Sequence, residues 1–410
     1  MCFVLLLYGF YSKISNNQKI SNNDVLNFSL NLKSSENIKD IKIIDQNNLL
    51  IVIPFSILIL IGLIMISSAS IFIAEANYND PFFYISRQFI FVSMGLLAMV
   101  FFLIIPSNFL LKIDWLLIHI SILLLVLLFV PDIGTSVNGS IRWIRVGSIG
   151  IQPSEICKFS LIIYISGYCL RRTSELHSLR NFLKPLALLS IISLLILSQP
   201  DLGSTAIICL VVVAILFYAG ISFFQFSLLT ILIAMLGYAA ITSSPMRIAR
   251  MMAYTDPFDP DVVLGSGYQL ANSLISIGQG GFFGLGLGNS FQKNFFLPEA
   301  HTDFIFAVLV EELGVIGGIF LIAAYVVLFI GMLNVALLCM KLKRVFQGLV
   351  CFGTTILFAS QTLFNLSVNI GLLPTKGLTL PFISYGGTSI IIMMSLVAIV
   401  LRINNENKLS

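Results

Sequence analysis

Acidic residues and a histidine cluster within an otherwise apolar stretch of the sequence. Glu299, His301 and Asp303 lie within five residues, and Glu311 with Glu312 follows inside a long apolar run. Desolvation raises the pKa of a carboxyl group, and a carboxylate with a raised pKa suits the work of a general base. Carboxylate oxygens are also the ligands that hard divalent cations prefer. The cluster therefore predicts a catalytic base, with a Mg²⁺ or Mn²⁺ site at Asp303 and Glu299 as a second possibility.

Basic residues in two other segments offer sites for an anion. Arg142 and Arg145 flank Trp143, and guanidinium groups at this spacing are suited to holding a phosphate through paired hydrogen bonds. Lys376 is the one cation of a loop rich in proline and glycine and is a candidate contact for an anionic headgroup. The alternative for all three cations is interfacial anchoring, in which the charged end of the side chain reaches for water.

Three further polar residues have both a functional and a structural interpretation. Glu155 and Lys158 are three residues apart, so one helix face holds them as an ion pair, either structural or in contact with substrate. Asp201 follows Gln199-Pro200 and stands where an N-cap would start a helix.

Two patterns in the second half of the chain are less specific. Gln361, Asn365 and Asn369 are spaced by four residues and share one helix face, which favours hydrogen bonds between helices. The glycine-rich run 278–289 is not a nucleotide-binding P-loop, and no strand precedes it. Its backbone N–H groups either approach a phosphate or form tight turns on the membrane surface.

The composition decides what kind of protein must position these residues. Of 410 residues, 58% are hydrophobic and 10% are charged, and the mean hydropathy is +0.99. Soluble domains carry about 25% charged residues. These values exclude a soluble enzyme, a disordered chain and a nucleic-acid binder. Apolar runs of 18 or more residues recur, which predicts an all-α polytopic membrane protein rather than a β-barrel.

About ten transmembrane helices are expected. Their predicted ranges are 50–74, 86–105, 112–131, 153–170, 184–199, 202–219, 222–242, 312–338, 346–370 and 383–402. With both termini in the cytoplasm, 15 of the 23 Lys and Arg residues lie inside and 8 outside. Because cytoplasmic loops are enriched in Lys and Arg, this orientation is favoured. The predicted location is the cytoplasmic membrane, with multiple passes.

The longest connection lies between spans seven and eight. Residues 243–302 form an extracytoplasmic loop, and long loops of this composition are usually functional. The apolar run 303–340 that follows would be about 57 Å long as a straight helix, against a hydrocarbon core of about 30 Å. Its first part is therefore expected to pack at the outer surface, with Gly317–Gly318 as a site for close helix packing or a kink.

Two tails are predicted to flank the membrane domain. Residues 1–49 are predicted to form a polar, disordered cytoplasmic tail, residues 50–403 the membrane domain, and 404–410 a second tail. The six cysteines show no CxxC or Cys/His spacing, so they are expected to act as small buried hydrophobic residues.

Six motifs in order along the chain carry a family resemblance. They are Gln152-Pro-Ser-Glu155-x-x-Lys158, Gln199-Pro-Asp-Leu-Gly203, Gly267-Tyr-Gln269, Leu297-Pro-Glu-Ala-His-Thr-Asp-Phe-Ile-Phe306, Glu311-Glu-Leu-Gly314 and Pro374-Thr-Lys-Gly-Leu-Thr-Leu-Pro-Phe-Ile-Ser-Tyr-Gly-Gly387. Together they resemble the SEDS family (shape, elongation, division and sporulation) over about residues 50–403. The motifs around 298–304 and 374–379 are more similar to the division member than to the elongation member.

This resemblance implies a peptidoglycan glycosyltransferase. Such an enzyme polymerises lipid II outside the cytoplasmic membrane, here at the division septum, with a class B penicillin-binding protein and other division proteins as partners. Asp303 matches the family's essential acid. The remaining expected substrate contacts are Arg142, Arg145, Glu155, Lys158, Glu299, His301, Lys376 and Ser384.

The reaction implied is an inversion at the donor sugar. Asp303 would accept the proton of the acceptor's 4-hydroxyl, and the cations would stabilise the departing pyrophosphate, with Mg²⁺ or Mn²⁺ as a candidate cofactor. An elongation-type polymerase, a lipid II flippase and a non-catalytic scaffold are the alternatives.

Overall fold

A computed structural model describes residues 29–137, 140–147, 149–173, 175–176 and 178–408. The chain divides into two compact units, residues 1–46 and 47–410. In the first unit, the described part is helical from Ser29. Residues 29–49 of the predicted polar tail are therefore helical, in a segment without Gly or Pro to end the helix. The rest of the predicted tail lies outside the described residues.

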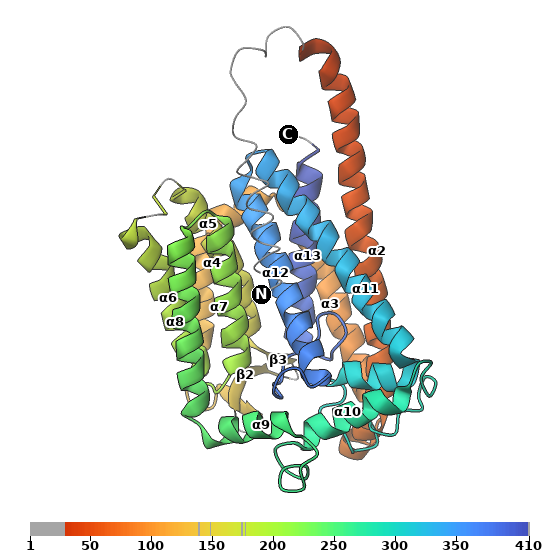
Figure 1. Ribbon diagram of the computed structural model, residues 1–410. Helices are drawn as coiled ribbons and strands as arrows, with labels where there is room; N and C mark the ends of the chain where they lie inside the picture. Colours follow the sequence, from red (N-terminus) through yellow and green to blue (C-terminus); the bar gives the residue numbers. More distant parts are fainter. Residues whose placement is uncertain (1–28, 138–139, 148, 174, 177, 409–410) are drawn as a thin grey trace. The chain divides into compact units, whose positions relative to one another are not determined.

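Ten long helices occupy the ten predicted ranges in the described part of the chain. They are α2 (Ser29–Tyr78), α3 (Phe83–Ile104), α4 (Ser107–Leu127), α5 (Pro153–Arg171), α6 (Leu179–Leu197), α7 (Leu202–Tyr218), α8 (Phe223–Thr242), α11 (Ile305–Lys341), α12 (Val345–Asn369) and α13 (Gly387–Glu406). Within residues 47–410 they form a bundle, in which α12 and α13 are mostly buried (Figure 1). Helix α8 buries only Leu229.

The apolar lengths of these helices confirm an all-α polytopic membrane protein. Among the described residues, eight helices are long and apolar enough to cross a membrane, and α7 is a shorter apolar helix. The tenth, α5, is long enough but contains Glu155, Lys158 and Arg171. The protein is therefore an integral membrane protein.

A small antiparallel sheet between α4 and α5 was not predicted. Its strands are β1 (Gly134–Val137), β2 (Ser140–Val146) and β3 (Ile149–Ile151), in the order β1-β2-β3. Thr135 pairs with Trp143, and Arg145 pairs with Gly150. A Cβ atom at Gly150 would lie 3.2 Å from the Trp143 ring, so the glycine leaves room for the indole. The strands are too short to give a periodic signal that stands out beside the apolar spans.

Helix α11 bends at Gly314, whereas Gly317–Gly318, predicted as a site of close packing or a kink, keeps a helical backbone. Gly314 has φ 72° and ψ −177°, a conformation that favours glycine. The bend frees the carbonyls of Glu311 and Glu312, which accept hydrogen bonds from Leu285 N (2.9 Å) and Gly286 N (2.9 Å). The six residues before Glu311 are all buried. The first part of α11 therefore packs inside the protein, as the length of the apolar run required.

The long loop between α8 and α11 contains two short helices. These are α9 (Pro245–Thr255) and α10 (Tyr268–Gly280), which lie across one end of the helix bundle (Figure 1). The sheet and the loops 198–201, 299–303 and 374–386 join helices at this same end. The fold thus gathers most of the predicted polar segments at one end of the bundle.

Candidate functional site

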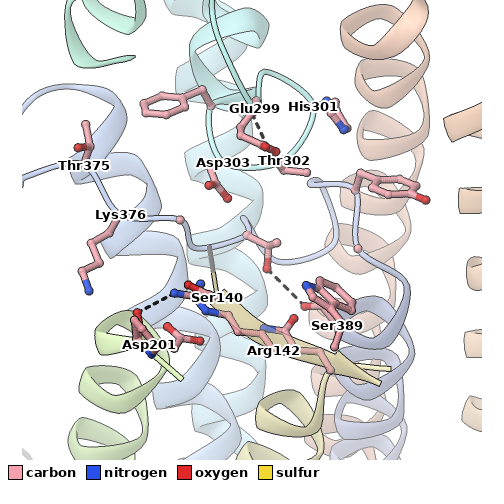
Figure 2. Close-up of a pocket in the computed structure, with 18 of the residues that line it drawn as sticks. Ser140, Arg142, Asp201, Glu299, His301, Thr302, Asp303, Thr375, Lys376 and Ser389 are labelled. Carbon is pink, nitrogen blue, oxygen red and sulfur yellow. Dashed lines mark hydrogen bonds between the residues drawn. The ribbon is translucent and has the colours of Figure 1, made fainter. Parts of the chain in front are cut away.

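A cavity of about 980 Å³ opens at this end of the bundle. Its wall includes six of the nine site residues predicted from the sequence, contributed by β2 and by the loops before α11 and α13: Arg142, Arg145, Glu299, His301, Asp303 and Lys376. In Figure 2 the side chains of Arg142, Asp303 and Lys376 point toward one shared space. The cavity combines carboxylates with cations, as an acid–base site for an anionic substrate requires.

Asp303 is held in place through its backbone. The amides of Asn365 and Asn369 donate to the Asp303 carbonyl at 2.8 and 3.1 Å, and the Asp303 N–H donates to the Glu299 carbonyl at 3.0 Å. The hydrogen bonds predicted for the amide stripe therefore form at two of its three positions. The third, Gln361, is buried without a hydrogen-bond partner among the described residues. Because the backbone carries these bonds, the Asp303 carboxylate is left to face the cavity.

Burial and, to a smaller extent, the nearby Glu299 carboxylate raise the pKa of Asp303 to about 7. The guanidinium of Arg142 acts in the opposite direction and favours the ionised form. A carboxyl group with a pKa near neutrality is a much stronger base than an exposed aspartate, yet a large fraction remains ionised at pH 7. The environment of Asp303 therefore suits the acceptance of a proton from a hydroxyl group.

Gly377 leaves the space that the Asp303 carboxylate occupies. A Cβ atom at Gly377 would lie 2.7 Å from Asp303 Oδ2. We expect Gly377→Ala to displace the carboxylate and to lower the turnover rate about 10²-fold, because small displacements of a reacting group carry such costs. Gly278→Ala is the control, since a Cβ there meets no atom within 4 Å. Equal turnover rates for the two variants would show that the close approach has no catalytic role.

Cations from three elements line the cavity near Asp303. Arg142 donates to the carbonyls of Gln199 (3.3 Å) and Pro200 (2.7 Å), which fixes its guanidinium at the wall. Burial lowers the pKa of Lys376 to about 8, and the neighbouring Asp201 carboxylate opposes this effect. Asp201 also caps α7, accepting from Ser204 N at 3.1 Å. The capping role predicted for it is therefore present, together with a place at the cavity.

Three cations of the cavity were not predicted as site residues. Arg87 lies on α3, and Arg247 and Arg250 lie on α9. The spacing of Arg247 and Arg250 by three residues places them on one face of a short amphipathic helix. This spacing was the available signal, but the segment is too short and too polar to be identified among the spans.

Glu299 and His301 face the cavity beside Asp303. Glu299 has φ 57°, and its Oε2 accepts from the Thr302 hydroxyl at 2.7 Å. The His301 ring lies 4.5 Å from that of Tyr84 and 5.8 Å from that of Tyr385. Burial lowers the pKa of His301, so its imidazole is neutral at pH 7. It contributes an uncharged ring surface to the cavity wall.

Three predicted substrate contacts are not on the cavity wall. Glu155 and Lys158 form a buried ion pair of 2.6 Å inside the bundle. Ser384 is buried and bonds loop backbone, donating to the Thr302 carbonyl and accepting from Leu380 N. The prediction of direct substrate contact is therefore corrected for these residues. Sequence spacing does not show whether a polar side chain at a helix start turns into the bundle or toward its end.

The last two acids of the 299–312 cluster hold the long loop. Glu311 accepts from the hydroxyls of Ser276 (2.7 Å) and Ser290 (2.6 Å), and Glu312 pairs with Lys293 at 2.8 Å. Both carboxylates are fully buried. The acidic cluster thus divides into Glu299 and Asp303, which face the cavity, and two acids that fasten the loop to α11.

The side chains at the cavity wall supply some, but not all, of the ligands that a metal ion needs. Among the described residues there is no group of three or more His, Cys, Asp and Glu side chains able to hold a metal ion. Glu299 and Asp303 supply two carboxylates at one wall of the cavity. Mg²⁺ is commonly held by one or two carboxylates with substrate phosphates and water as the other ligands. The two residues fit that arrangement and not a closed protein site.

The fold and cavity define a polytopic membrane protein with a half-buried acid facing a cationic cavity at one end of its bundle. The chain belongs to the FtsW/RodA/SpoVE family, described as cell cycle proteins, whose model matches residues 48–409. It is 43% identical over 353 residues to a probable peptidoglycan glycosyltransferase FtsW of Legionella pneumophila, covering 86% of this chain and 89% of that protein. A protein of the same description from Taylorella equigenitalis is 43% identical over 350 residues, covering 85% and 95%.

Solved structures share the fold. A chain from a peptidoglycan synthase complex that coordinates polymerization and crosslinking matches with a TM-score of 0.70 and 24% identity, covering 87% of this chain and 97% of that one. The rod shape-determining protein RodA of Thermus thermophilus matches with a TM-score of 0.64 and 24% identity, covering 87% and 96%. The ten-helix arrangement is therefore that of the family.

Proposed function

We propose that this protein is a peptidoglycan glycosyltransferase of the division type, which polymerises lipid II into β-1,4-linked glycan strands. Membership of the family and about 40% identity to proteins of that activity support the proposal. The observation that carries it is the half-buried Asp303 carboxyl group, with its pKa raised, facing the cations of the cavity. This is the arrangement that an inverting transfer from a lipid pyrophosphate needs.

The cavity residues divide the reaction between them. The bond from C1 of the donor sugar to the pyrophosphate oxygen breaks, and C1 bonds to the acceptor's 4-oxygen. Asp303 accepts the hydroxyl proton as the new bond forms. The departing pyrophosphate gains negative charge, which Arg142 and Lys376, with Arg247 and Arg250, are placed to stabilise.

A divalent cation is part of the proposal. Glu299 and Asp303 would hold Mg²⁺ or Mn²⁺ together with substrate oxygens, and the cation would add positive charge against the leaving group. We expect a chelator to lower strand synthesis and added Mn²⁺ to restore it. Glu299→Gln should raise the Mn²⁺ concentration needed for half of the maximal rate. Strand synthesis that is unchanged by the chelator would remove the metal from the account.

The location and partners follow from charge and from a structural relative. The excess of Lys and Arg at the end opposite the cavity favours a cytoplasmic location for both termini. The cavity would then face the outer side of the cytoplasmic membrane, at the division septum. One relative of known structure belongs to a complex that also crosslinks peptidoglycan. We infer that a class B penicillin-binding transpeptidase, with other division membrane proteins, is the partner here.

The proposal is tested with purified protein, its cognate transpeptidase and labelled lipid II. We expect long glycan strands on a gel, formed also when the transpeptidase active site is blocked. A parallel assay in liposomes measures movement of lipid II across the bilayer. Movement without strand formation would favour a flippase and would refute the proposed function.

A further inference from the structure

The cavity has an aromatic end that the chemistry above does not use. Its wall there comes from the end of α2, the start of α3 and the loops before α11 and α13, and consists of Tyr78, Phe83, Arg87, Phe91, His301 and Tyr385. We call these six residues the aromatic arm. Nothing in the proton transfer or in the stabilisation of the leaving group requires rings at this place.

The rings of the aromatic arm brace one another. Tyr78 stacks on Phe83 with ring centroids 3.6 Å apart, and the Arg87 guanidinium lies 4.3 Å from the centroid of Phe83. The Tyr385 ring contacts those of His301 (5.8 Å) and Phe91 (6.4 Å). Phe91 and His301 are buried, whereas 49% of the Tyr78 surface is exposed. The arm is thus a packed layer of rings with part of its surface open to the cavity.

The cavity wall continues on both sides of Asp303. In Figure 2, Lys376 lies on one side of Asp303, and His301, a residue of the aromatic arm, lies on the other. An inverting transfer needs this separation, because the attacking hydroxyl reaches C1 from the face opposite the leaving group. If the pyrophosphate occupies the cationic side, the acceptor sugar must approach from the side of the rings.

The chemistry of the aromatic arm suits a sugar. One face of a pyranose ring carries C–H groups, and such a face packs on the negative face of an aromatic ring. The hydroxyl and acetamido groups at the sugar's edge need polar partners, which the guanidinium of Arg87 and the hydroxyls of Tyr78 and Tyr385 supply. A phosphate would instead prefer Lys376 on the other side of Asp303, which no aromatic ring covers in Figure 2.

We propose that the aromatic arm is the acceptor subsite. It holds the terminal N-acetylated hexosamine of the acceptor and directs its 4-hydroxyl toward Asp303. This inference rests on the proposed function and adds to it a division of the cavity into a cationic donor side and an aromatic acceptor side.

Binding at the donor side and binding at the acceptor side are measured separately with two analogues, one that acts only as donor and one that acts only as acceptor. The obligate donor is a lipid II analogue whose terminal sugar has its 4-hydroxyl inverted, so that it does not act as acceptor. The obligate acceptor is an analogue in which a methylene group replaces the oxygen at C1, so that its pyrophosphate does not leave. Together they form one new glycosidic bond per turnover. The KM of each substrate is measured with the other at saturation.

We expect Tyr78→Leu and Tyr385→Leu each to raise the acceptor KM about three- to tenfold, the loss of one aromatic contact, with the donor KM unchanged within about twofold. Arg247→Gln should raise the donor KM instead. Phe296→Leu is the matched control, since its ring is exposed and lies outside the cavity wall. It should change neither KM. If Tyr385→Leu does not fold, the acceptor KM of Tyr78→Leu, at the more exposed position, is sufficient to test the inference.

The outcomes distinguish the inference from the proposed function. A wild-type protein that forms the product, with tyrosine variants that raise the donor KM or change neither KM, would overturn the acceptor subsite and leave the glycosyltransferase standing. A wild-type protein that forms no product from these analogues and no strands from lipid II would overturn both.

Discussion

Asp303→Asn is expected to lower the rate of strand synthesis about 10²- to 10⁴-fold, the usual contribution of a general base. The amide has nearly the same shape as the carboxyl group but does not accept the hydroxyl proton. The backbone bonds from Asn365 and Asn369 to residue 303 do not involve the side chain and should persist. The measurement is kcat/KM for lipid II, with the variant in complex with its transpeptidase.

A matched control separates this loss from a general effect of charge. Asp261 is an exposed acid of the same long loop and lies outside the cavity wall. Asp261→Asn should retain the wild-type rate, and both variants should keep the wild-type melting temperature in detergent. An Asp303→Asn variant with more than about a tenth of the wild-type rate would show that another group accepts the proton.

Lys293→Met should lower the free energy of unfolding by about 3–5 kcal/mol, because it leaves the Glu312 carboxylate buried without its cation. The two side chains are 2% and 0% exposed and lie 2.8 Å apart. The Lys293 ammonium also donates to the Ser68 hydroxyl (2.9 Å) and to the Gly288 carbonyl (2.7 Å). Its loss should therefore loosen the loop that carries Asp303. Thermal unfolding in detergent measures the change.

The ion-pair account is checked by a double variant and by an exposed pair. Lys293→Met combined with Glu312→Gln removes both charges and should recover much of the stability. Arg172 and Glu175 form an ion pair whose side chains are 44% and 52% exposed, so Arg172→Met should cost less than about 1 kcal/mol. If Lys293→Met has as small an effect as Arg172→Met, the buried pair does not fasten the loop.

The sequence predicted the membrane fold because long apolar runs have few other solutions. Each of the ten predicted ranges became a helix, and the length of the run from residue 303 required its first part to remain inside the protein. The bend lies at Gly314, before the glycine pair that was predicted as a site of close packing or a kink. At Gly314 a Cβ would lie 2.3 Å from the Phe282 carbonyl oxygen, a contact that only the folded loop reveals.

The candidate site was predicted where function needs unusual residues in an apolar setting. Asp303, Glu299 and His301 stood out for that reason, and the structure places all three on the cavity wall. Glu155 and Lys158 stood out in the same way but satisfy each other inside the bundle. Burying a charged side chain costs free energy, which a favourable interaction must offset. The sequence does not show whether that interaction is with another residue or with a substrate.

The aromatic arm had no sequence signal of its own. Phenylalanine and tyrosine are common throughout this chain. In the sequence, Tyr385 lies far from Tyr78 and Phe83. Only the folding of α2, α3 and the loop before α13 brings their rings together. Sites made from common residue types are found from the assembled structure, whereas a rare acid is already visible in the sequence.

The pH dependence of kcat/KM for lipid II tests most directly whether Asp303 and the cationic cavity perform the transfer. Asp303 accepts a proton only when ionised, so the rate should rise with pH through about 7. Lys376 stabilises the leaving group only when protonated, so the rate should fall above about 8. A bell-shaped profile is the predicted result, with its alkaline limb moved to higher pH in Lys376→Arg. A rate that stays constant between about pH 5.5 and 9.5 would contradict the account.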